Sequence, residues 1–333
     1  MLRKAETLVM VLLSVAVYCT PGQAQVNPAS ILELSFENIV AYANDVTDYA
    51  RLATDPNPVA RSPVRNFSAF VMVGDIVAVN GKPAKGTLLI RGQGINLRVN
   101  PMPGQGIADA LRQNISDQTM EILHPDGTPI GTIVVSSLGG GLPPPGAPAG
   151  TVSTSLAVIG GTGAFLGVRG QAAYVQLAPR NASMAEDPAN RRLNGGGDGR
   201  RILHLIPLAR PEIVSTISGP AIAHSNDFAR ITAARPAAPG ETLSLFATGL
   251  GPTRPGVDPG KPFPASPLAV VNSPVEVTVN GRPAEVLAAV GYPGAVDGYQ
   301  VNFRVPPDTV RGVARIQLNV AWIAGSEVSI PVQ

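Results

Sequence analysis

The sequence predicts an all-β protein made of two parts, and three observations lead to this class. Glycine and proline contribute 36 and 33 of the 333 residues, which suits many short strands joined by tight turns. Apolar and polar residues alternate over many short segments, as in strands with one buried face. Hydrophobic residues make up 44% of the chain and charged residues only 14%, so the protein has enough apolar side chains for extensive cores.

Residues 1–24 have the features of a secretory signal peptide. Basic residues precede an apolar run from Leu8 to Tyr18, and the small residues Gly22 and Ala24 stand at −3 and −1 of a cut before Gln25. The run is too short for a permanent membrane helix, and no later segment approaches about 20 apolar residues. We therefore expect a secreted, periplasmic or cell-surface protein without a membrane span. The single cysteine, Cys19, is lost with the signal, which leaves no thiol for catalysis or metal binding.

Residues 25–209 are expected to form an eight-stranded antiparallel barrel domain. About eight segments between Phe36 and Leu208 combine apolar alternation with glycine turns. The segment at residues 105–115 has Ile107, Leu111 and Ile115 at helical spacing and is interpreted as a short helix, with a strand as the alternative.

Residues 210–333 are expected to form an antiparallel β-sandwich. Three valines from Val275 to Val279 alternate with polar residues and are followed by Asn280 and Gly281, a strong signal for a two-residue hairpin. The segment at residues 324–326 is expected to turn the last hairpin.

The stretch LAVIGGTGAFLGVRGQAAYVQL, residues 156–177, resembles the start of a dinucleotide-binding unit but lacks its essential parts. Gly161 and Gly163 are followed by Leu166 where the motif needs glycine, and residues 168–177 alternate as a strand. Without a following helix there is no N-terminus to bind phosphate. We therefore expect the glycines to form a strand-to-strand corner that needs positive φ and close backbone approach, and we expect no nucleotide cofactor.

The same residues carry a family resemblance. AVIGGTGAFLGVRGQAAYV resembles the glycine corner of dirigent proteins and of the related allene oxide cyclase-like barrels. Two further segments follow the family's order: VAYANDV, with Asn44 where the family has histidine, and RGQG at residues 91–94. The resemblance covers about residues 36–209 and implies an eight-stranded barrel whose interior can hold a small hydrophobic ligand.

The C-terminal part, residues 211–333, resembles a domain found at the ends of secreted proteins of soil Acidobacteria and related to Ig-like, IPT/TIG-type folds. The segments that carry this resemblance are SLFATGLGPTRP, SPVEVTVNGRPAEV, GYQVNFRVP and VSIPVQ. It implies a sandwich that takes part in adhesion, ligand binding or cell-surface architecture, with a cell-envelope or extracellular partner.

The barrel resemblance also implies candidate catalytic residues. In some dirigent-type proteins an Asp on the first strand and an Arg further along act on the substrate inside the barrel. Asp45 and Arg169 occupy these places here. A carboxylate facing a guanidinium in an apolar lumen could act as an acid or base. The alternative is structural: Asp45 caps backbone amides near a turn, and Arg169 braces the glycine corner.

Other site chemistry has weaker support in the sequence. His124, His204 and His224 lack the spacing of a metal site, so no metal is expected. A net charge of +2 without dense basic runs does not suit nucleic-acid binding. Trp322 and Tyr299 are interpreted as sandwich-core residues, with a sugar-binding platform as the alternative.

These observations leave three functions open. The first is a secreted binding or structural module whose barrel holds a small hydrophobic molecule. The second is a dirigent or cyclase-type enzyme or stereochemical guide, and the third is an architectural protein with a filled barrel. A lumen lined by Asp, Arg and Tyr would favour the enzyme, an open apolar lumen the binding module, and a lumen packed by Leu, Ile and Val the architectural protein.

Mass spectrometry of the exported protein tests the signal peptide. We expect the mature chain to begin at Gln25, because the residues before it fit the peptidase and follow the apolar run. A mature chain that retains Cys19, or carries lipid there, would contradict this prediction.

Overall fold

The computed structural model describes residues 30–45, 67–96, 112–139, 154–182 and 186–333. The expected signal peptide lies outside these residues. So do Ile107 and Leu111 of the expected short helix, whereas Ile115 belongs to a strand, in agreement with the alternative. In the described parts of the chain, no helix is long and apolar enough to cross a bilayer.

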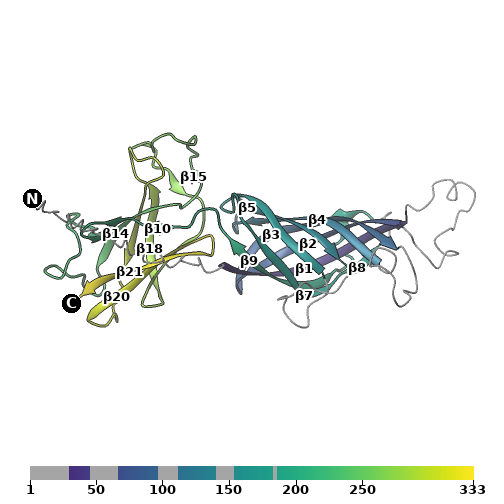
Figure 1. Cartoon of the computed structure of the whole chain (residues 1–333), viewed down its shortest axis with the longest axis horizontal. Coiled ribbons are helices and arrows are strands. Elements are labelled where there is room, and N and C mark those ends of the chain that lie inside the picture. The colour runs from purple at the N-terminus through teal and green to yellow at the C-terminus, as the bar shows by residue number, and fades with distance from the viewer. Residues whose placement is uncertain (1–29, 46–66, 97–111, 140–153, 183–185) are drawn as a thin grey trace, which may run out of the picture.

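The N-terminal half forms the predicted closed antiparallel barrel of eight strands (Figure 1). Neighbouring strands follow the chain, and the ring closes because β1 pairs with both β2 and β9. The barrel strands are β1 (Ser30–Asp45), β2 (Phe67–Val79), β3 (Lys82–Asn96), β4 (Arg112–Leu123), β5 (Pro129–Gly139), β6 (Thr154–Gly163), β7 (Arg169–Ala178) and β9 (Gly197–Ile206).

Strand alternation fills much of the lumen with apolar side chains. Every second residue of these strands points inward, and large residues occupy these positions over most of the strand lengths. Fully or almost fully buried examples are Leu32, Leu34, Phe36, Leu88, Ile90, Met120, Ile122, Ile133, Val135, Leu203 and Leu205. The barrel is therefore a packed core over most of its length.

A short segment covers the outside of β1 and β2. Strand β8 (Arg180–Ala182) pairs in parallel with β1, and a 3₁₀ turn (Pro188–Asn190) follows it. Arg191 and Arg192 from this segment form ion pairs with Asp75 of β2, which also accepts a hydrogen bond from Asn38 at 3.0 Å. Burial alone would raise the pKa of Asp75, but hydrogen bonds from Arg192, Asn38 and Arg191 outweigh it and lower that pKa.

The glycine corner joins two strands, as predicted. Strand β6 ends at Gly163, a four-residue turn follows, and β7 begins at Arg169 with no helix after it. Gly163 has a φ of +61°, whereas Gly161 is not among the residues with positive φ. A Cβ on Gly161 would instead lie 2.5 Å from the carbonyl oxygen of Phe165 and 2.6 Å from that of Thr132. The expected positive φ is thus found at Gly163, whereas close approach of the neighbouring backbone explains why residue 161 is glycine.

The C-terminal half forms a second antiparallel sheet, which is nearly closed. Strand β18 pairs with β17 through its first residues and with β19 through the rest, so it joins the two halves of the sheet. The main strands are β10 (Glu212–Ile213), β14 (Thr242–Thr248), β17 (Val275–Val279), β18 (Arg282–Gly291), β19 (Tyr299–Arg304), β20 (Gly312–Val320) and β21 (Ile323–Val332). Shorter strands join its edges: β13 (Ile222–His224) pairs with β14, β15 (Thr253–Arg254) with β16 (Val270–Val271), and β16 with β18. A separate hairpin joins β11 (Ser215–Thr216) to β12 (Gly219–Pro220).

One predicted hairpin of this sheet is confirmed and another is corrected. Asn280 and Gly281 turn between β17 and β18 with φ of +51° and +76°. The last hairpin turns at Ala321 and Trp322, which have φ of +48° and +63°, and the segment 324–326 lies inside β21. Gly325 is needed for packing, because a Cβ there would lie 2.1 Å from the carbonyl oxygen of Pro211.

Specific contacts join the barrel to the second sheet. Nε2 of His124, at the end of β4, lies 2.5 Å from the carbonyl oxygen of Asn272, whose Nδ2 donates to the carbonyl oxygen of Pro129 at 3.0 Å. Arg254 donates to the hydroxyl of Thr128 at 3.0 Å. The turn between β4 and β5 therefore docks on the second sheet, and the two parts lie end to end (Figure 1).

Two neighbouring glycines test the explanation of the corner. We expect Gly161→Ala to destabilise the barrel by about 2–4 kcal/mol, because the new Cβ meets two backbone oxygens. Gly160→Ala is the matched control, since the nearest atom to its Cβ is Nη1 of Arg169 at 3.5 Å. Urea unfolding of both variants measures the difference, and equal stabilities would contradict the explanation.

Addition of NAD or NADP should leave the melting temperature of the unaltered protein unchanged, whereas a saturable rise would support the rejected nucleotide site.

Candidate functional site

Arg201 lies at the centre of a polar cluster inside the barrel. It is on β9 and has no exposed surface. Its guanidinium crosses the lumen to β4 on the opposite wall, where Nη2 donates to Oε1 of Gln118 at 2.6 Å and Nη1 donates to Sδ of Met120 at 3.3 Å. One side chain thus links two strands that do not pair with each other.

Four further polar side chains complete the cluster. The ring centroid of Tyr174 lies 4.1 Å from Cζ of Arg201, and its hydroxyl donates to Oε1 of Gln118 at 3.0 Å. Nε2 of Gln118 donates to the hydroxyls of Ser116 and Ser137 at 3.1 and 3.3 Å, and the two hydroxyls also bond each other. The cluster therefore extends across β9, β7, β4 and β5.

Strand periodicity explains why these side chains meet. Leu203 and Leu205 point into the core, so the period of two also points Arg201 inward and Arg200 outward. Ser116 and Gln118 are inward on β4 for the same reason. Sequence reasoning treated this segment of β9 only as a strand. An arginine in register with buried leucines is the signal that would have identified it.

The charge of Arg201 has no carboxylate partner among the described residues. The ion pairs found within 4.0 Å in these parts of the chain do not include it, and its buried Nε lacks a hydrogen-bond acceptor. Burial lowers the pKa of Arg201, although Tyr174 opposes this, and burial also raises the pKa of Tyr174. Because arginine stays protonated in proteins, the lumen holds a buried cation. A planar guanidinium with a free N–H is well suited to bind a carboxylate or a similar anion.

The cluster separates two halves of the lumen, and the half away from the second sheet combines small residues with the large side chains of Phe70 and Leu177. Beyond it, toward the ends of the strands that lie away from the second sheet, buried or partly buried small residues face the lumen: Ala41, Gly92, Gly94 and Gly199. Phe70 packs over Gly92, where a Cβ would lie 2.3 Å from Cζ of the ring. Strands β1, β3 and β5 end at this side of the barrel, where β2, β4 and β6 begin (Figure 1).

The structure does not bring the two predicted catalytic residues together. Asp45 pairs with Ser68 at the far end of β1, whereas Arg169 pairs with Ile206 beside the start of β1. Strand β1 has 16 residues, and at about 3.3 Å per residue it extends about 50 Å. Arg169 is exposed, and its Nη1 donates to the carbonyl oxygen of Val168 at 3.0 Å, which fits the bracing role. A separate catalytic role for either residue stays a prediction.

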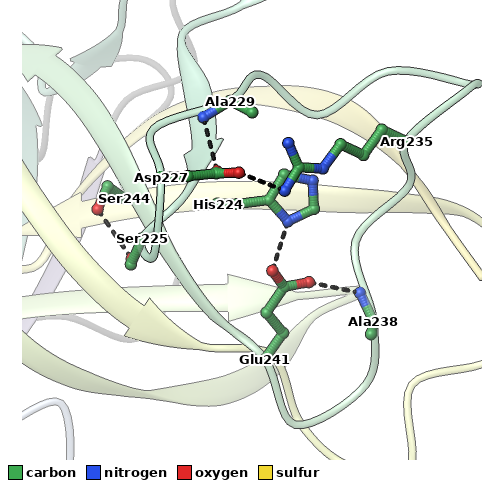
Figure 2. Close-up of polar contacts among 8 residues, drawn as sticks. All are labelled: His224, Ser225, Asp227, Ala229, Arg235, Ala238, Glu241 and Ser244. Carbon is green, nitrogen blue, oxygen red and sulfur yellow. Dashed lines mark hydrogen bonds and ion pairs between the residues drawn. The ribbon is translucent and has the colours of Figure 1, made fainter.

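The three histidines lie in different environments. His124 contacts the second sheet, His204 is exposed on β9, and His224 is buried on β13. Figure 2 shows the surroundings of His224, whose Nδ1 bonds a carboxylate oxygen of Glu241. Within the described residues, no three His, Cys, Asp or Glu side chains form a group that could hold a metal ion.

The contacts around His224 order the chain that leads into β14. The second carboxylate oxygen of Glu241 accepts from the amide of Ala238 at 2.9 Å, and Asp227 accepts from Arg235 at 2.6 Å (Figure 2). The nearby serines, Ser225 and Ser244, bond each other at 2.8 Å, and Ser244 also donates to Asn302. In the described residues, the side-chain hydrogen bonds of these two serines are to each other and to Asn302, so this group lacks the nucleophile–base contact of a catalytic triad.

Comparisons with known proteins identify no family. No protein-family model matches the chain, and no curated protein matches it. A solved structure described as a polysaccharide lyase shares 9% sequence identity over 78% of this chain and 35% of its own, with a TM-score of 0.17. The chain thus spans about a third of that protein. A TM-score of this size does not indicate a shared fold or a shared activity.

A double-mutant cycle tests the energetics of the Arg201 cluster. We expect Gln118→Leu to destabilise the barrel by about 3 kcal/mol, because it leaves the guanidinium and the hydroxyl of Tyr174 without their buried acceptor. Arg201→Met removes the buried charge and should be neutral or stabilising. The double variant should therefore be more stable in urea unfolding than the sum of the two single effects predicts, with the unpaired hydroxyl of Tyr174 as the remaining cost. Strictly additive effects, or Arg201→Met as the more damaging change, would contradict this prediction.

Proposed function

We propose that this chain is an exported binding protein whose barrel takes up a small molecule with an apolar body and an anionic head. The observation that carries the proposal is the buried charge of Arg201, which has no carboxylate partner among the described residues and has an unused N–H at Nε. A cation kept in a lumen without a counterion weakens the fold, and an anionic ligand would supply the missing charge.

The surroundings of Arg201 suit the two ends of such a molecule. The guanidinium provides donors to the head, and the stack on Tyr174 holds its plane in place. Near the cluster, Phe70 and Met72 are apolar and only partly buried, and they would pack against an apolar body. An apolar wall with few polar groups is typical of small-molecule sites.

Export and an envelope role belong to the same proposal. The N-terminal sequence supports export, and the closed eight-stranded barrel is the architecture that the dirigent and allene oxide cyclase resemblance implies. The second sheet would then attach the barrel to a cell-envelope or extracellular partner, as the Ig-like resemblance implies. The enzymatic alternative named Asp45 and Arg169 as a catalytic pair, and strand pairing puts their backbones at opposite ends of the barrel.

Paired ligands test the binding proposal. We expect dodecanoate to bind the full mature chain and raise its melting temperature in a saturable way, because its carboxylate meets Arg201. Dodecanol, which has the same apolar chain without the charge, should bind at least tenfold more weakly. Arg201→Met should remove this preference for the charged ligand.

Arg200→Met is the matched control for the binding experiment. Arg200 is the neighbouring residue on β9 but points outward, where it pairs with Glu33 at 3.3 Å. Its loss should leave dodecanoate binding unchanged. The proposal fails if neither ligand binds, or if Arg201→Met binds dodecanoate as tightly as the unaltered protein does.

A further inference from the structure

A pocket on the second sheet has the features of a small-molecule binding site. Its volume is about 140 Å³, and it lies between the chain that follows β15 and the connection from β18 to β19. Thr253, Phe263 and Tyr299 are buried and form its floor, whereas Asp258, Lys261 and Asp297 are exposed at its rim. It is far along the chain from the barrel cluster and shares no residue with it.

Backbone hydrogen bonds join the two segments that form the pocket. The amide of Phe263 donates to the carbonyl oxygen of Ala295 at 2.9 Å, and the amide of Gly294 donates back to Phe263 at 2.9 Å. Each segment is also closed by its own bond, from Lys261 to Asp258 at 3.1 Å and from Tyr292 to Gly298 at 2.8 Å. The pocket is therefore preorganised, which reduces the entropy lost when a ligand binds.

The floor of the pocket is aromatic and fixed in position. The rings of Phe263 and Tyr299 lie 5.1 Å apart between centroids at an angle of 56°. Phe263 packs over Gly291, where a Cβ would lie 2.3 Å from its ring, and the hydroxyl of Tyr299 donates to the carbonyl oxygen of Gly251 at 2.7 Å. That hydroxyl oxygen keeps a lone pair that can accept a hydrogen bond from a ligand.

The rim combines hydrogen-bond acceptors with a donor. The carboxylates of Asp258 and Asp297 accept hydrogen bonds, and the ammonium group of Lys261 donates them. A sugar ring presents hydroxyl groups that both donate and accept at its edge, and C–H groups on its faces that pack on aromatic rings. A simple cation would meet Lys261 as a like charge, and a simple anion would meet two carboxylates.

We infer that this pocket binds one neutral sugar ring, either free or at the end of a glycan. The ring packs against the floor of Phe263 and Tyr299, and its hydroxyl groups bond Asp258, Asp297 and Lys261. The volume of about 140 Å³ suits a single ring. Trp322, the other half of the sugar platform considered from the sequence, is not part of this pocket and packs against the core.

Saturation-transfer NMR and calorimetry with the full mature chain test the inference. The probes are the methyl glycosides of glucose, galactose, mannose and N-acetylglucosamine. We expect at least one of them to bind with a Kd of about 1–10 mM, which is normal for a ligand of this size. Asp297→Asn and Asp258→Asn should each weaken that binding at least fivefold, and Lys261→Met should also weaken it.

Two control variants make the result specific to the pocket. Glu327→Gln removes a carboxylate on β21 that pairs with Arg315 at 3.8 Å outside the pocket, and it should leave sugar binding unchanged. Arg201→Met should also leave it unchanged, so the two proposed sites succeed or fail separately. The inference is overturned if none of the four glycosides binds, if the pocket variants bind as tightly as the unaltered protein, or if propylammonium binds the pocket and the sugars do not.

Discussion

The hydrogen bond between Arg201 and Gln118 is the contact on which the arrangement of the barrel lumen depends. It joins opposite walls of a closed barrel at 2.6 Å, and Tyr174, Ser116 and Ser137 take their positions from the same two side chains. Below this contact the lumen is filled by large apolar residues, and beyond it small residues lie beside the large side chains of Phe70 and Leu177. A buried guanidinium weakens a core unless something offsets its charge, so a stabilising role alone does not explain why it lies there.

The position of the second sheet gives the two ends of the barrel different surroundings. The turn between β4 and β5 docks on that sheet through contacts of His124, Thr128 and Pro129. These contacts are at the end of the barrel where β4 ends and β5 begins, and the other end of the barrel lies away from the second sheet (Figure 1). The ligand proposed for Arg201 and the sugar proposed for the pocket on the second sheet would therefore bind in different parts of the molecule.

Local sequence signals predicted the fold well, and long-range geometry limited the prediction of the site. Strand alternation and the Asn280–Gly281 turn give the eight strands and one hairpin, because both signals act over a few residues. The last hairpin was placed wrongly since Gly325 serves close packing against Pro211, which only the folded chain shows. Asp45 and Arg169 could not be tested as a pair from sequence, because strand register decides which residues lie at the same level of a barrel. Arg201 was missed although its place in the period of β9 would have identified it.

The most direct test of the account is a crystal structure of the purified mature protein at a resolution that defines ordered solvent and ions. The account predicts that Arg201 crosses the lumen to Gln118 and that a bound anion, or the head of a bound molecule, has an oxygen within about 3.2 Å of Nε. A carboxylate of this same chain paired with Arg201 would contradict the account, because the cation would then be neutralised without a ligand. A lumen closed over Arg201 by apolar side chains, with no acceptor at Nε, would contradict it as well.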